Sequence, residues 1–412
     1  MANVDLSIEI AGVRFKNPVA AASGVITRSV HSVEGCIEAG ASAIVTKSIS
    51  FVSGVSGGKW LLPRPAIWLL DKYGDPGSSQ NISIGNFKED EGIEFVKKIK
   101  PLTQAADVVL IPNINIMSDT EFFSEDEALE RTANLAKRLE LAGADMLEVF
   151  NACPIDVGRN SGGDWGTISD IDHLVKVAET LKQTVGIPFY FKLHTDVTCA
   201  HFERLEMAGA AGHTIYSLFP ATVIDIETGM PILPFPSPYY GRGISAHENY
   251  QTARLSALTT HPIITSGGTM TARDVISRLM CGASVVEVMT AAMRYGIKIF
   301  TEMVDGLESF MIRKGYESLQ DIKGISVPHV NNPEEYERFV TERQVPREAM
   351  SMTIDRGKCV GCAQCSVCPY GAMSMQDGFP RWKAKLCEFC GLCQTICQTD
   401  AITIMRRKQG EK

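Results

Sequence analysis

Short apolar runs of about four to eight residues alternate along the chain with longer segments whose apolar residues recur every three or four positions. The short runs are typical of buried parallel strands and the longer ones of amphipathic helices. The candidate strands are Val19–Ser23, Ala43–Lys47, Val108–Asn115, Asp145–Phe150, Phe189–Leu193, Gly212–Tyr216, Pro262–Ser266 and Val285–Met289. Helical patterns between them include Glu127–Leu141, Ser169–Leu181 and Thr271–Cys281. The alternation predicts an α/β fold, a (β/α)8 TIM barrel with its chemistry at the carboxyl ends of the strands.

Glycines mark the ends of several helical patterns. The tripeptide Ala-Gly-Ala places them at Gly40, Gly143 and Gly209, and Cys281-Gly282-Ala283 repeats the device. Glycine directly after a helix favours a left-handed C-terminal cap. Each of these positions is therefore expected to end a helix before the next strand.

Two long regions interrupt the alternation. Ser53–Asp90 is rich in Gly, Pro and Ser but also contains Trp60, Trp68 and Tyr73, which favours a packed insertion that covers a site. Ile226–Tyr250 contains four prolines and is expected to be an irregular excursion.

Eight of the twelve cysteines form two runs near the C-terminus. In two-cluster ferredoxins, three closely spaced cysteines bind one [4Fe–4S] cluster, and the fourth cysteine of the same run binds the other cluster. The pattern predicts one cluster on Cys359, Cys362, Cys365 and Cys397, and a second on Cys387, Cys390, Cys393 and Cys368.

The runs depart from the usual spacing at two points. Only two residues separate Cys365 from Cys368, and Gln398 stands where a proline is usual. Structural zinc is the alternative for cysteine pairs, but zinc needs two Cys-x-x-Cys pairs for each site. A triplet with a remote fourth cysteine favours iron–sulfur clusters. Such clusters transfer single electrons, so the rest of the chain must supply whatever gives or takes them.

The chain has 412 residues, which is enough for a barrel of about 250 residues or more and an appended domain. A helical pattern at Phe300–Lys314 follows the last strand. We expect a barrel over residues 1–315, a charged connector over 316–349 and a ferredoxin-like domain with two [4Fe–4S] clusters over 350–412.

Composition narrows the class of protein. A formal net charge of −8 argues against a nucleic-acid surface, and no run of eighteen apolar residues predicts a membrane span. The beginning of the chain lacks the pattern of a secretory signal. Cys36, Cys153, Cys199 and Cys281 are scattered, which is a reduced, cytoplasmic pattern. No Gly-x-Gly-x-x-Gly follows a strand, so a nicotinamide site is not expected.

Polar residues gather at the carboxyl ends of the expected strands. Gly267-Gly268 after the seventh strand, with Thr290 after the eighth, is typical of a barrel phosphate site, although a tight turn also explains the glycines. Lys47 and Lys192 are harder to explain structurally, because a buried lysine is costly without an anion or acceptor. The N1–C2=O edge of a flavin, which becomes anionic on reduction, suits either lysine.

Several of these motifs occur together in a known family. Asn17-Pro18, Ala22-Ser23-Gly24, Thr46-Lys47-Ser48, Phe191-Lys192-Leu193 and Ser266-Gly267-Gly268 resemble the FMN barrel of dihydroorotate dehydrogenases. With its cysteine-rich domain the chain more closely resembles the pyrimidine-reducing subunit of dihydropyrimidine dehydrogenases. Met293–Gly296 and Gly315–Gln320 extend this similarity beyond the barrel.

The resemblance implies FMN in the barrel mouth, electrons delivered by the clusters, and hydride transfer from flavin N5 to a ring C=C bond. The residues it implies for FMN are Ala22, Ser23, Gly24, Lys47, Ser48, Asn115, Lys192, Gly243, Ser266, Gly267, Gly268, Met289 and Thr290. It also implies that Cys153 is the general acid, and a thiol does hold its proton at neutral pH. The alternative for Cys153 is a small buried apolar residue.

The substrate residues depart from the family. Phe150 stands where the family has a substrate-binding Asn, with Asn151 one residue late, and Tyr216-Ser217 replaces an Asn-Thr pair. A shift of one residue turns a side chain to the other face of a strand, so Asn151 does not simply replace the lost Asn. With His194, these five residues are the candidate substrate site. They predict poor binding of uracil and favour another flat ring or a conjugated acyl group.

Three functions remain open from the sequence. The first is an FMN and iron–sulfur oxidoreductase that acts on a C–C bond beside a carbonyl in a cyclic substrate. The second is a non-catalytic electron-transfer subunit, and the third is a dihydroorotate dehydrogenase, whose barrels do not normally carry a ferredoxin-like domain. The expected electron donor is an FAD/NAD(P)H-dependent subunit or a ferredoxin, and the enzyme is expected to be an oligomer.

Overall fold

The computed structural model describes residues 4–51, 67–69, 77–80, 86–116, 123–150, 171–194, 197–217, 219–231 and 237–407. The chain divides into two compact units, Met1–Asn332 and Pro333–Lys412. Each unit is built around a hydrophobic core of its own.

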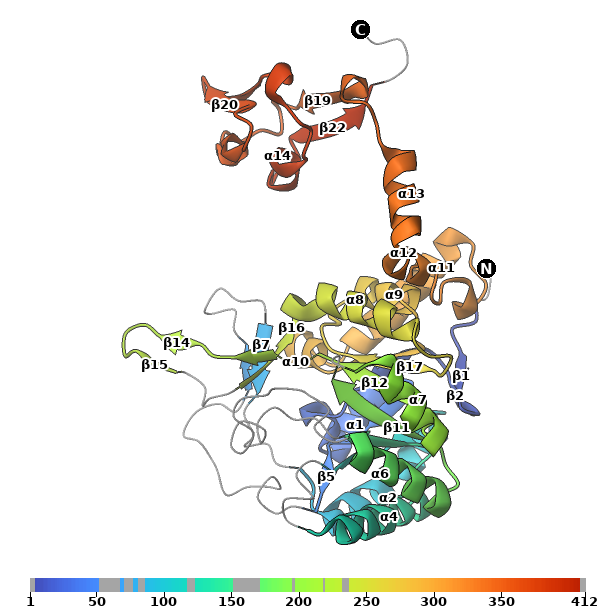
Figure 1. Ribbon diagram of the computed structural model, residues 1–412. Helices are drawn as coiled ribbons and strands as arrows, with labels where there is room; N and C mark the ends of the chain where they lie inside the picture. The colour runs from blue at the N-terminus through green and yellow to red at the C-terminus, as the bar shows by residue number, and fades with distance from the viewer. Residues whose placement is uncertain are drawn as a thin grey trace. The chain divides into compact units, whose positions relative to one another are not determined.

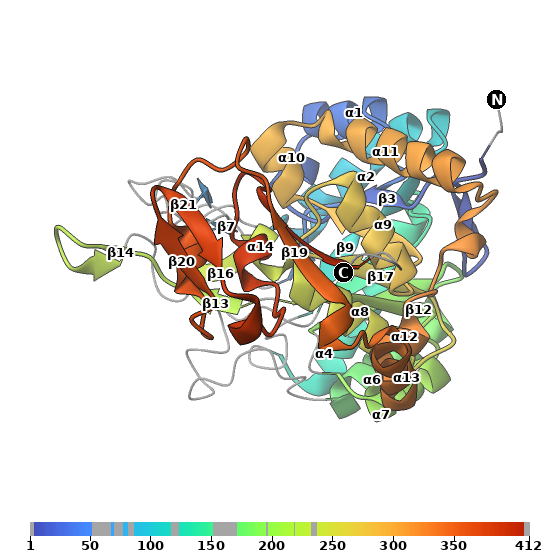
Figure 2. The ribbon, with the colours of Figure 1, turned by 90° about the horizontal axis from the view of Figure 1, so that it is seen from above.

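The first unit contains a ten-stranded parallel sheet that curls on itself (Figures 1 and 2). In spatial order its strands are β5 (Ile49–Ser50), β9 (Asn113–Asn115), β10 (Leu147–Phe150), β11 (Phe189–His194), β12 (Gly212–Tyr216), β17 (Ile263–Ser266), β18 (Val285–Val288), β3 (Val19–Ala21), β4 (Ala43–Val45) and β8 (Val109–Ile111). The outermost strands are β5 and β8, and β8 is separated in the chain only by Pro112 from β9, the neighbour of β5. Both ends of the sheet therefore meet in one stretch, and the sheet is barrel-like.

All eight predicted strands are confirmed. One of them is interrupted: residues 108–115 form β8 and β9 around Pro112, which has no N–H to donate. Another is shorter than predicted, since the strand expected at 43–47 ends as β4 at Val45. The strands are rich in branched apolar side chains that are buried on both faces of the sheet. Because all strand pairs are parallel, their carboxyl ends lie on one side of the sheet.

Helices surround this sheet (Figure 2). They are α1 (Val30–Glu38), α2 (Glu89–Ala105), α4 (Glu125–Leu141), α6 (Ile171–Thr184), α7 (Cys199–Ala208), α8 (Ser245–Ser256), α9 (Ala272–Met280), α10 (Thr290–Tyr295) and α11 (Ile299–Lys314). The expected helices are present, and their ends lie within three residues of the predicted ones. Gly40, Gly143, Gly209 and Gly282 follow helices with φ between 96° and 120°, as the glycine pattern predicted.

The two insertions pair with each other. In a four-stranded antiparallel sheet, β6 (Ile67–Leu69) and β7 (Gly77–Gln80) from the first insertion join β16 (Ser237–Gly241) and β13 (Phe219–Ala221). The second insertion is thus more regular than expected, because it contains β16 and the start of α8. A short hairpin of β14 (Ile224–Asp225) with β15 (Met230–Pro231) spans the start of the second insertion. Trp60 and Tyr73 lie outside the described residues.

The expected connector is divided between the units. Residues 316–332 belong to the first unit, because Leu319 and Ile322 are buried in its core and α12 (Val327–Asn331) packs on α8. The second unit begins with helix α13 (Pro333–Arg343). The described part of the chain contains no helix that is both long and apolar enough to cross a bilayer.

The second unit contains two small antiparallel pairs. They are β19 (Met350–Ile354) with β22 (Ile402–Arg406), and β20 (Met373–Gln376) with β21 (Phe379–Trp382). Between them lie the 3-10 turn η6 (Gln364–Val367) and helix α14 (Leu392–Thr395). The hydrophobic core of the second unit is small and includes Cys387 and Cys393 beside Met352, Met373 and Ile402.

Candidate active site and cysteine pockets

A buried ionic cluster lies inside the curled sheet. The Nζ atom of Lys192 on β11 is 2.6 Å from Glu287 Oε2 on β18 and 3.3 Å from Glu148 Oε1 on β10. Asn113 on β9 donates its Nδ2 hydrogen to Glu148 Oε1 at 2.6 Å. The three charged side chains are at most 9% exposed. Polar side chains therefore fill a layer that barrels usually fill with branched apolar ones.

The charges within this cluster are set by competing effects. Burial lowers the pKa of Lys192, but the charges of Glu148 and Glu287 outweigh it, so the pKa is raised and the ammonium stays charged. For Glu148, burial opposes ionisation, but the Lys192 charge prevails and lowers the pKa. Burial and the Glu148 charge raise the pKa of Glu287 to about 8, against the attraction of Lys192.

Three rings meet at the carboxyl ends of β10, β11 and β12, and the first two of these strands also carry members of the ionic cluster. The ring centroids of Phe150 and Tyr216 are 5.8 Å apart, and those of His194 and Tyr216 are 6.0 Å apart with the rings edge to face. Lys192 Nζ lies 6.0 Å from the centroid of the Tyr216 ring. Three of the five candidate substrate residues are thus brought together. Asn151 and the candidate acid Cys153 lie outside the described residues.

The fifth candidate, Ser217, is held by a buried acid that the sequence did not single out. The backbone N–H of Ser217 donates to Glu248 Oε1 on α8. Burial raises the pKa of Glu248 to about 7, although the charge of Arg278 opposes this. Arg278, also buried, donates to the carbonyl oxygens of Ser245 and Gly267 at 2.9 Å each. Together these groups fix the loop at the end of β17.

This loop has the geometry of a close-approach turn. Gly267 and Gly268 have φ values of 113° and 70°, and a side chain on Gly268 would lie 2.7 Å from the Cα atom of Ser245. Thr269 is buried, and its hydroxyl has no hydrogen-bond partner among the described residues. Asp274 accepts from the Thr271 N–H at 2.9 Å and so caps the start of α9. An anion at the loop would therefore rely on the glycine N–H groups and Thr269.

The residues that follow β3 and β4 add further polar groups at the same end of the sheet. Lys47 Nζ donates to Asn86 Oδ1 at 2.8 Å, and the hydroxyl oxygens of Ser23 and Ser48 are 3.4 Å apart. Asn115, at the end of β9, is buried beside Phe150 in the strand register.

The remaining candidates flank them. Ala22 continues the pairing of β3 by donating its N–H to Val288 at 3.1 Å. A Cβ atom on Gly24 would lie 2.0 Å from Met289 Sδ, and one on Gly243 would lie 2.4 Å from the Tyr239 hydroxyl, so a side chain at either position requires its neighbour to move. Ser266 ends β17, and buried Thr290 begins α10.

These donors fit a phosphorylated flavin. A flavin phosphate needs N–H and hydroxyl donors, which the loop at Gly267–Thr269 supplies, and its ring needs a cation near the N1–C2=O edge. An ammonium has three N–H donors, and Glu148 and Glu287 take two of those of Lys192. The third can reach a carbonyl or an anion.

Four residues of the site were missed from the sequence, namely Glu148, Glu248, Arg278 and Glu287. Two of them carried a usable signal. Glu148 and Glu287 each stand inside an apolar strand run, Leu147–Phe150 and Val285–Val288, where burial on both faces leaves a lone carboxylate without solvent. An acid in such a strand predicts a buried partner.

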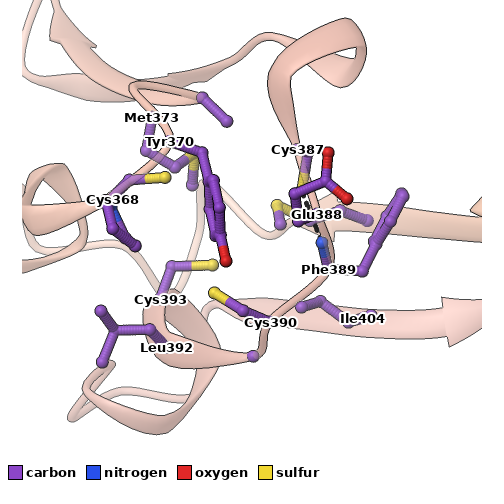
Figure 3. A pocket seen from close by; sticks show the side chains of 14 residues that line it. Cys368, Tyr370, Met373, Cys387, Glu388, Phe389, Cys390, Leu392, Cys393 and Ile404 are labelled. Atoms are coloured by element: carbon purple, nitrogen blue, oxygen red, sulfur yellow. Dashed lines mark hydrogen bonds between the residues drawn. The ribbon is translucent and has the colours of Figure 1, made fainter.

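The eight cysteines of the second unit line two separate pockets. The first pocket is lined by Cys359, Cys362, Cys365 and Cys397, and the second by Cys368, Cys387, Cys390 and Cys393. Figure 3 shows the second group around one space, beside Tyr370 and Leu392. This grouping is the crossed arrangement expected for the two clusters. No set of three or more His, Cys, Asp or Glu side chains among the described residues is placed to hold a single metal ion.

The short spacing between Cys365 and Cys368 is accommodated by a 3-10 turn. Residues Gln364–Val367 form η6, which ends at Cys368, so the two neighbouring cysteines line different pockets. The sulfur of the remote cysteine of each run also accepts hydrogen bonds from backbone N–H groups. Ala401 donates to Cys397 Sγ at 3.2 Å, and such bonds, against the effect of burial, lower the pKa of Cys397 and of Cys368.

Double substitutions test the crossed assignment. Because Cys359 and Cys397 line one pocket, Cys359→Ala with Cys397→Ala should leave the other cluster intact and halve the iron content. Cys359→Ala with Cys368→Ala removes one ligand from each pocket and should impair both clusters. Iron analysis and the EPR signal of the reduced protein measure this. Equal iron loss in both double variants would contradict the crossed arrangement, and Cys199→Ala, in the first unit, is the matched control.

Comparison with known proteins agrees with the fold. A family model described as "Dihydroorotate dehydrogenase" matches residues 243–311, which include the glycine loop and Glu287. The solved structure of DHODH from Eimeria tenella in complex with ferulenol is similar, with a TM-score of 0.61 and 19% identity, over 79% of this chain and 89% of that one.

Two curated relatives bear on function. The NAD-dependent dihydropyrimidine dehydrogenase subunit PreA of Escherichia coli K12 is 26% identical, over 100% of this chain and 98% of its own length. The catalytic subunit of dihydroorotate dehydrogenase B (NAD(+)) from Thermoplasma volcanium is 29% identical, over 78% of this chain and 99% of its own. The first relative thus also extends over the cysteine-rich unit.

Proposed function

Because the chain is an oxidoreductase of the dihydroorotate dehydrogenase-like family, which acts on CH–CH bonds, we propose that it is an FMN and iron–sulfur enzyme. In this proposal the curled sheet is a (β/α)8 barrel that binds FMN at its carboxyl end. The reaction is the reduction of a C=C bond beside a carbonyl group in a cyclic substrate. The residues 350–412 form a ferredoxin-like domain that carries two [4Fe–4S] clusters.

One observation carries the proposal: three rings, Phe150, Tyr216 and His194, stand next to a buried, charged lysine at the carboxyl ends of β10, β11 and β12. Flat apolar walls favour a planar substrate that stacks or packs edge to face. The ammonium of Lys192 favours a group that gains negative charge during the reaction. This combination suits hydride transfer to a conjugated ring better than it suits electron transfer alone.

When bound, FMN would supply a hydride from N5 to one carbon of the C=C bond. The protein's residues do the rest. The Gly267–Thr269 loop would hold the phosphate, and Lys192 would offset charge at the pyrimidine edge of the flavin. Cys153 would deliver a proton to the neighbouring carbon, since it follows the end of β10 by three residues and its thiol holds its proton at neutral pH.

Electrons would enter through the cysteine pockets. The full-length relative is named as a subunit of an NAD-dependent enzyme, and the sequence of this chain contains no nicotinamide motif. We therefore propose that the donor is an FAD/NAD(P)H-dependent subunit or a ferredoxin. The clusters would pass electrons one at a time to the flavin, and the flavin would pass them to the substrate as a pair.

The aromatic wall favours a substrate other than uracil. Phe150 and Tyr216 cannot supply the amide contacts that the resemblance assigns to asparagines at these positions, and unmade hydrogen bonds to a polar ring are costly. We expect the double substitution Phe150→Asn with Tyr216→Asn to raise the ratio of kcat/KM for uracil to kcat/KM for the native substrate by about 10-fold or more. Steady-state kinetics with both compounds measure it. A variant as inactive toward uracil as the wild type would mean that these rings do not set specificity.

The test of the function is an anaerobic reoxidation screen. The chemically reduced protein is mixed with uracil, thymine and a panel of cyclic enones and flat aromatic rings, and the visible absorbance of the flavin is followed. Reoxidation by a compound outside the pyrimidines is the expected result. Rapid reoxidation by uracil or thymine would keep the chemistry and overturn the substrate class, and reoxidation by no compound would favour a non-catalytic electron-transfer subunit.

A further inference from the structure

The ionic cluster inside the sheet contains more acid than base. Two carboxyl groups, Glu148 and Glu287, contact the one ammonium of Lys192, at 3.3 and 2.6 Å. The exposed fractions of the three side chains are 2%, 1% and 9%. A cluster of two carboxylates and one ammonium would place a net negative charge in a dry interior, which is strongly unfavourable.

The hydrogen bonds show which carboxyl oxygens of the cluster lack a donor. Glu148 Oε1 accepts from Asn113 and from Lys192, and Glu287 Oε2 accepts from Lys192. Glu148 Oε2 and Glu287 Oε1 are buried and have no donor among the described residues. Both carboxyl groups contact the same ammonium, and the charge of Glu148 acts on Glu287. Two carboxylates offer only acceptors, so a proton on one of the two carboxyl groups removes the excess negative charge.

Glu287 is the better holder of that proton. Glu148 has two donors, Asn113 and Lys192, both of which favour its ionised form. Glu287 has one donor and faces the charge of Glu148. The strands that flank Glu287 bring no other titratable group, since β3 is Val19–Ala21 and β17 is Ile263–Ser266. The titratable groups that bear on Glu287 are thus Glu148 on β10 and Lys192 on β11.

We propose that Glu287 is a positioning residue that holds a proton at neutral pH, so that Glu148 and Lys192 form a neutral ion pair and the cluster carries no net charge. The inference rests on the proposed flavin site in one respect: loss of the Glu287 proton adds a negative charge next to Lys192. That charge opposes the negative charge which a flavin ring gains at its pyrimidine edge when it takes up two electrons and one proton. Glu287 thereby makes flavin reduction depend on pH.

The proton itself can be detected without flavin. Infrared spectra of the flavin-free protein should contain the carbonyl band of a buried carboxylic acid that disappears as the pH rises through about 8. Glu287→Gln should lack this band. Glu248→Gln is the matched control, because Glu248 is a second buried acid whose pKa burial raises to about 7. Its substitution should remove a different band and leave that of Glu287.

Stability gives a second readout that does not depend on flavin. Folding raises the pKa of Glu287 from its ordinary 4.5 to about 8, so the folded chain holds a proton that the unfolded chain has released. The free energy of unfolding of the wild type should therefore fall relative to that of Glu287→Gln as the pH rises from about 4.5 to about 8. A constant difference between the two proteins across this range, or no acid band in the wild type at neutral pH, would overturn the inference.

Redox titration then links the proton to the flavin. In the wild type the midpoint potential of the flavin should fall more steeply with pH above about 8, because reduction of the flavin there also leads Glu287 to take up a proton. Glu287→Gln should match the wild type at neutral pH and lack the steeper region. Identical profiles in both proteins would refute the link. If the protein binds no flavin, the proposed function fails, while the infrared and stability measurements still decide whether Glu287 holds the proton.

Discussion

Replacing Lys192 by methionine should destabilise the protein by about 3–5 kcal/mol at neutral pH, the usual cost of leaving a buried charge without its partner. Among the residues that the structure describes, only Lys192 places an ammonium group in contact with the buried carboxyl groups of Glu148 and Glu287. Without it Glu148 would be an isolated carboxylate in the sheet interior. Its pKa would rise, so the loss of stability should shrink as the pH falls and the carboxyl group becomes neutral.

Two further variants separate charge from packing. Glu148→Gln in the Lys192→Met background removes the stranded charge and should recover most of the lost stability, measured by urea denaturation. Lys47→Met should have a much smaller effect, because Lys47 is only half-buried and donates a hydrogen bond to the neutral side chain of Asn86. Flavin content should fall with Lys192→Met. A loss of stability below about 1 kcal/mol, a value typical of exposed ion pairs, would contradict the buried cluster.

Cys153→Ala should lower kcat by about 100- to 10,000-fold while flavin and iron contents stay at the wild-type level. The reason is that a positioned acid lowers the barrier to protonating carbon, whereas binding of the cofactors does not need the thiol. Rapid mixing of the reduced variant with substrate should show slow flavin reoxidation. Reduction of its flavin by the electron donor should be as fast as in the wild type.

The matched control is Cys199→Ala. Cys199 starts helix α7, where its thiol contacts Glu203, and it lies on no strand end. It should turn over like the wild type. If Cys153→Ala turned over equally fast, Cys153 would not be the proton donor, and the acid would have to be another group of the site.

The strand positions could be predicted because each strand is a local apolar run. All eight runs form strands, and the glycine after Ala142 ends its helix as expected. The meeting of Phe150, Tyr216 and His194 follows from the parallel order of β10, β11 and β12, which the alternation of strands and helices already indicates. Local pattern and topology were sufficient for this part of the site.

The ionic cluster and the insertion sheet could not be predicted in the same way. Contact of Glu287 on β18 with Lys192 on β11 depends on how the sheet curls, since β12 and β17 lie between these strands in the sheet. The pairing of β7 with β16 joins residues about 160 positions apart, and only the folded topology brings them together. The unit boundary at Asn332 likewise depends on the burial of Leu319 and Ile322, which a charged stretch of sequence conceals.

The most direct test of the central claim is the number of substrate molecules that one fully reduced chain can reduce without an electron donor. A flavin that holds an electron pair, and two clusters that hold one electron each, store enough for about two reductions per chain. We expect about two product molecules per chain in an anaerobic titration, with flavin and cluster signals reoxidised together. One product with the clusters still reduced would contradict electron flow from clusters to flavin, and no product would contradict catalysis by the barrel.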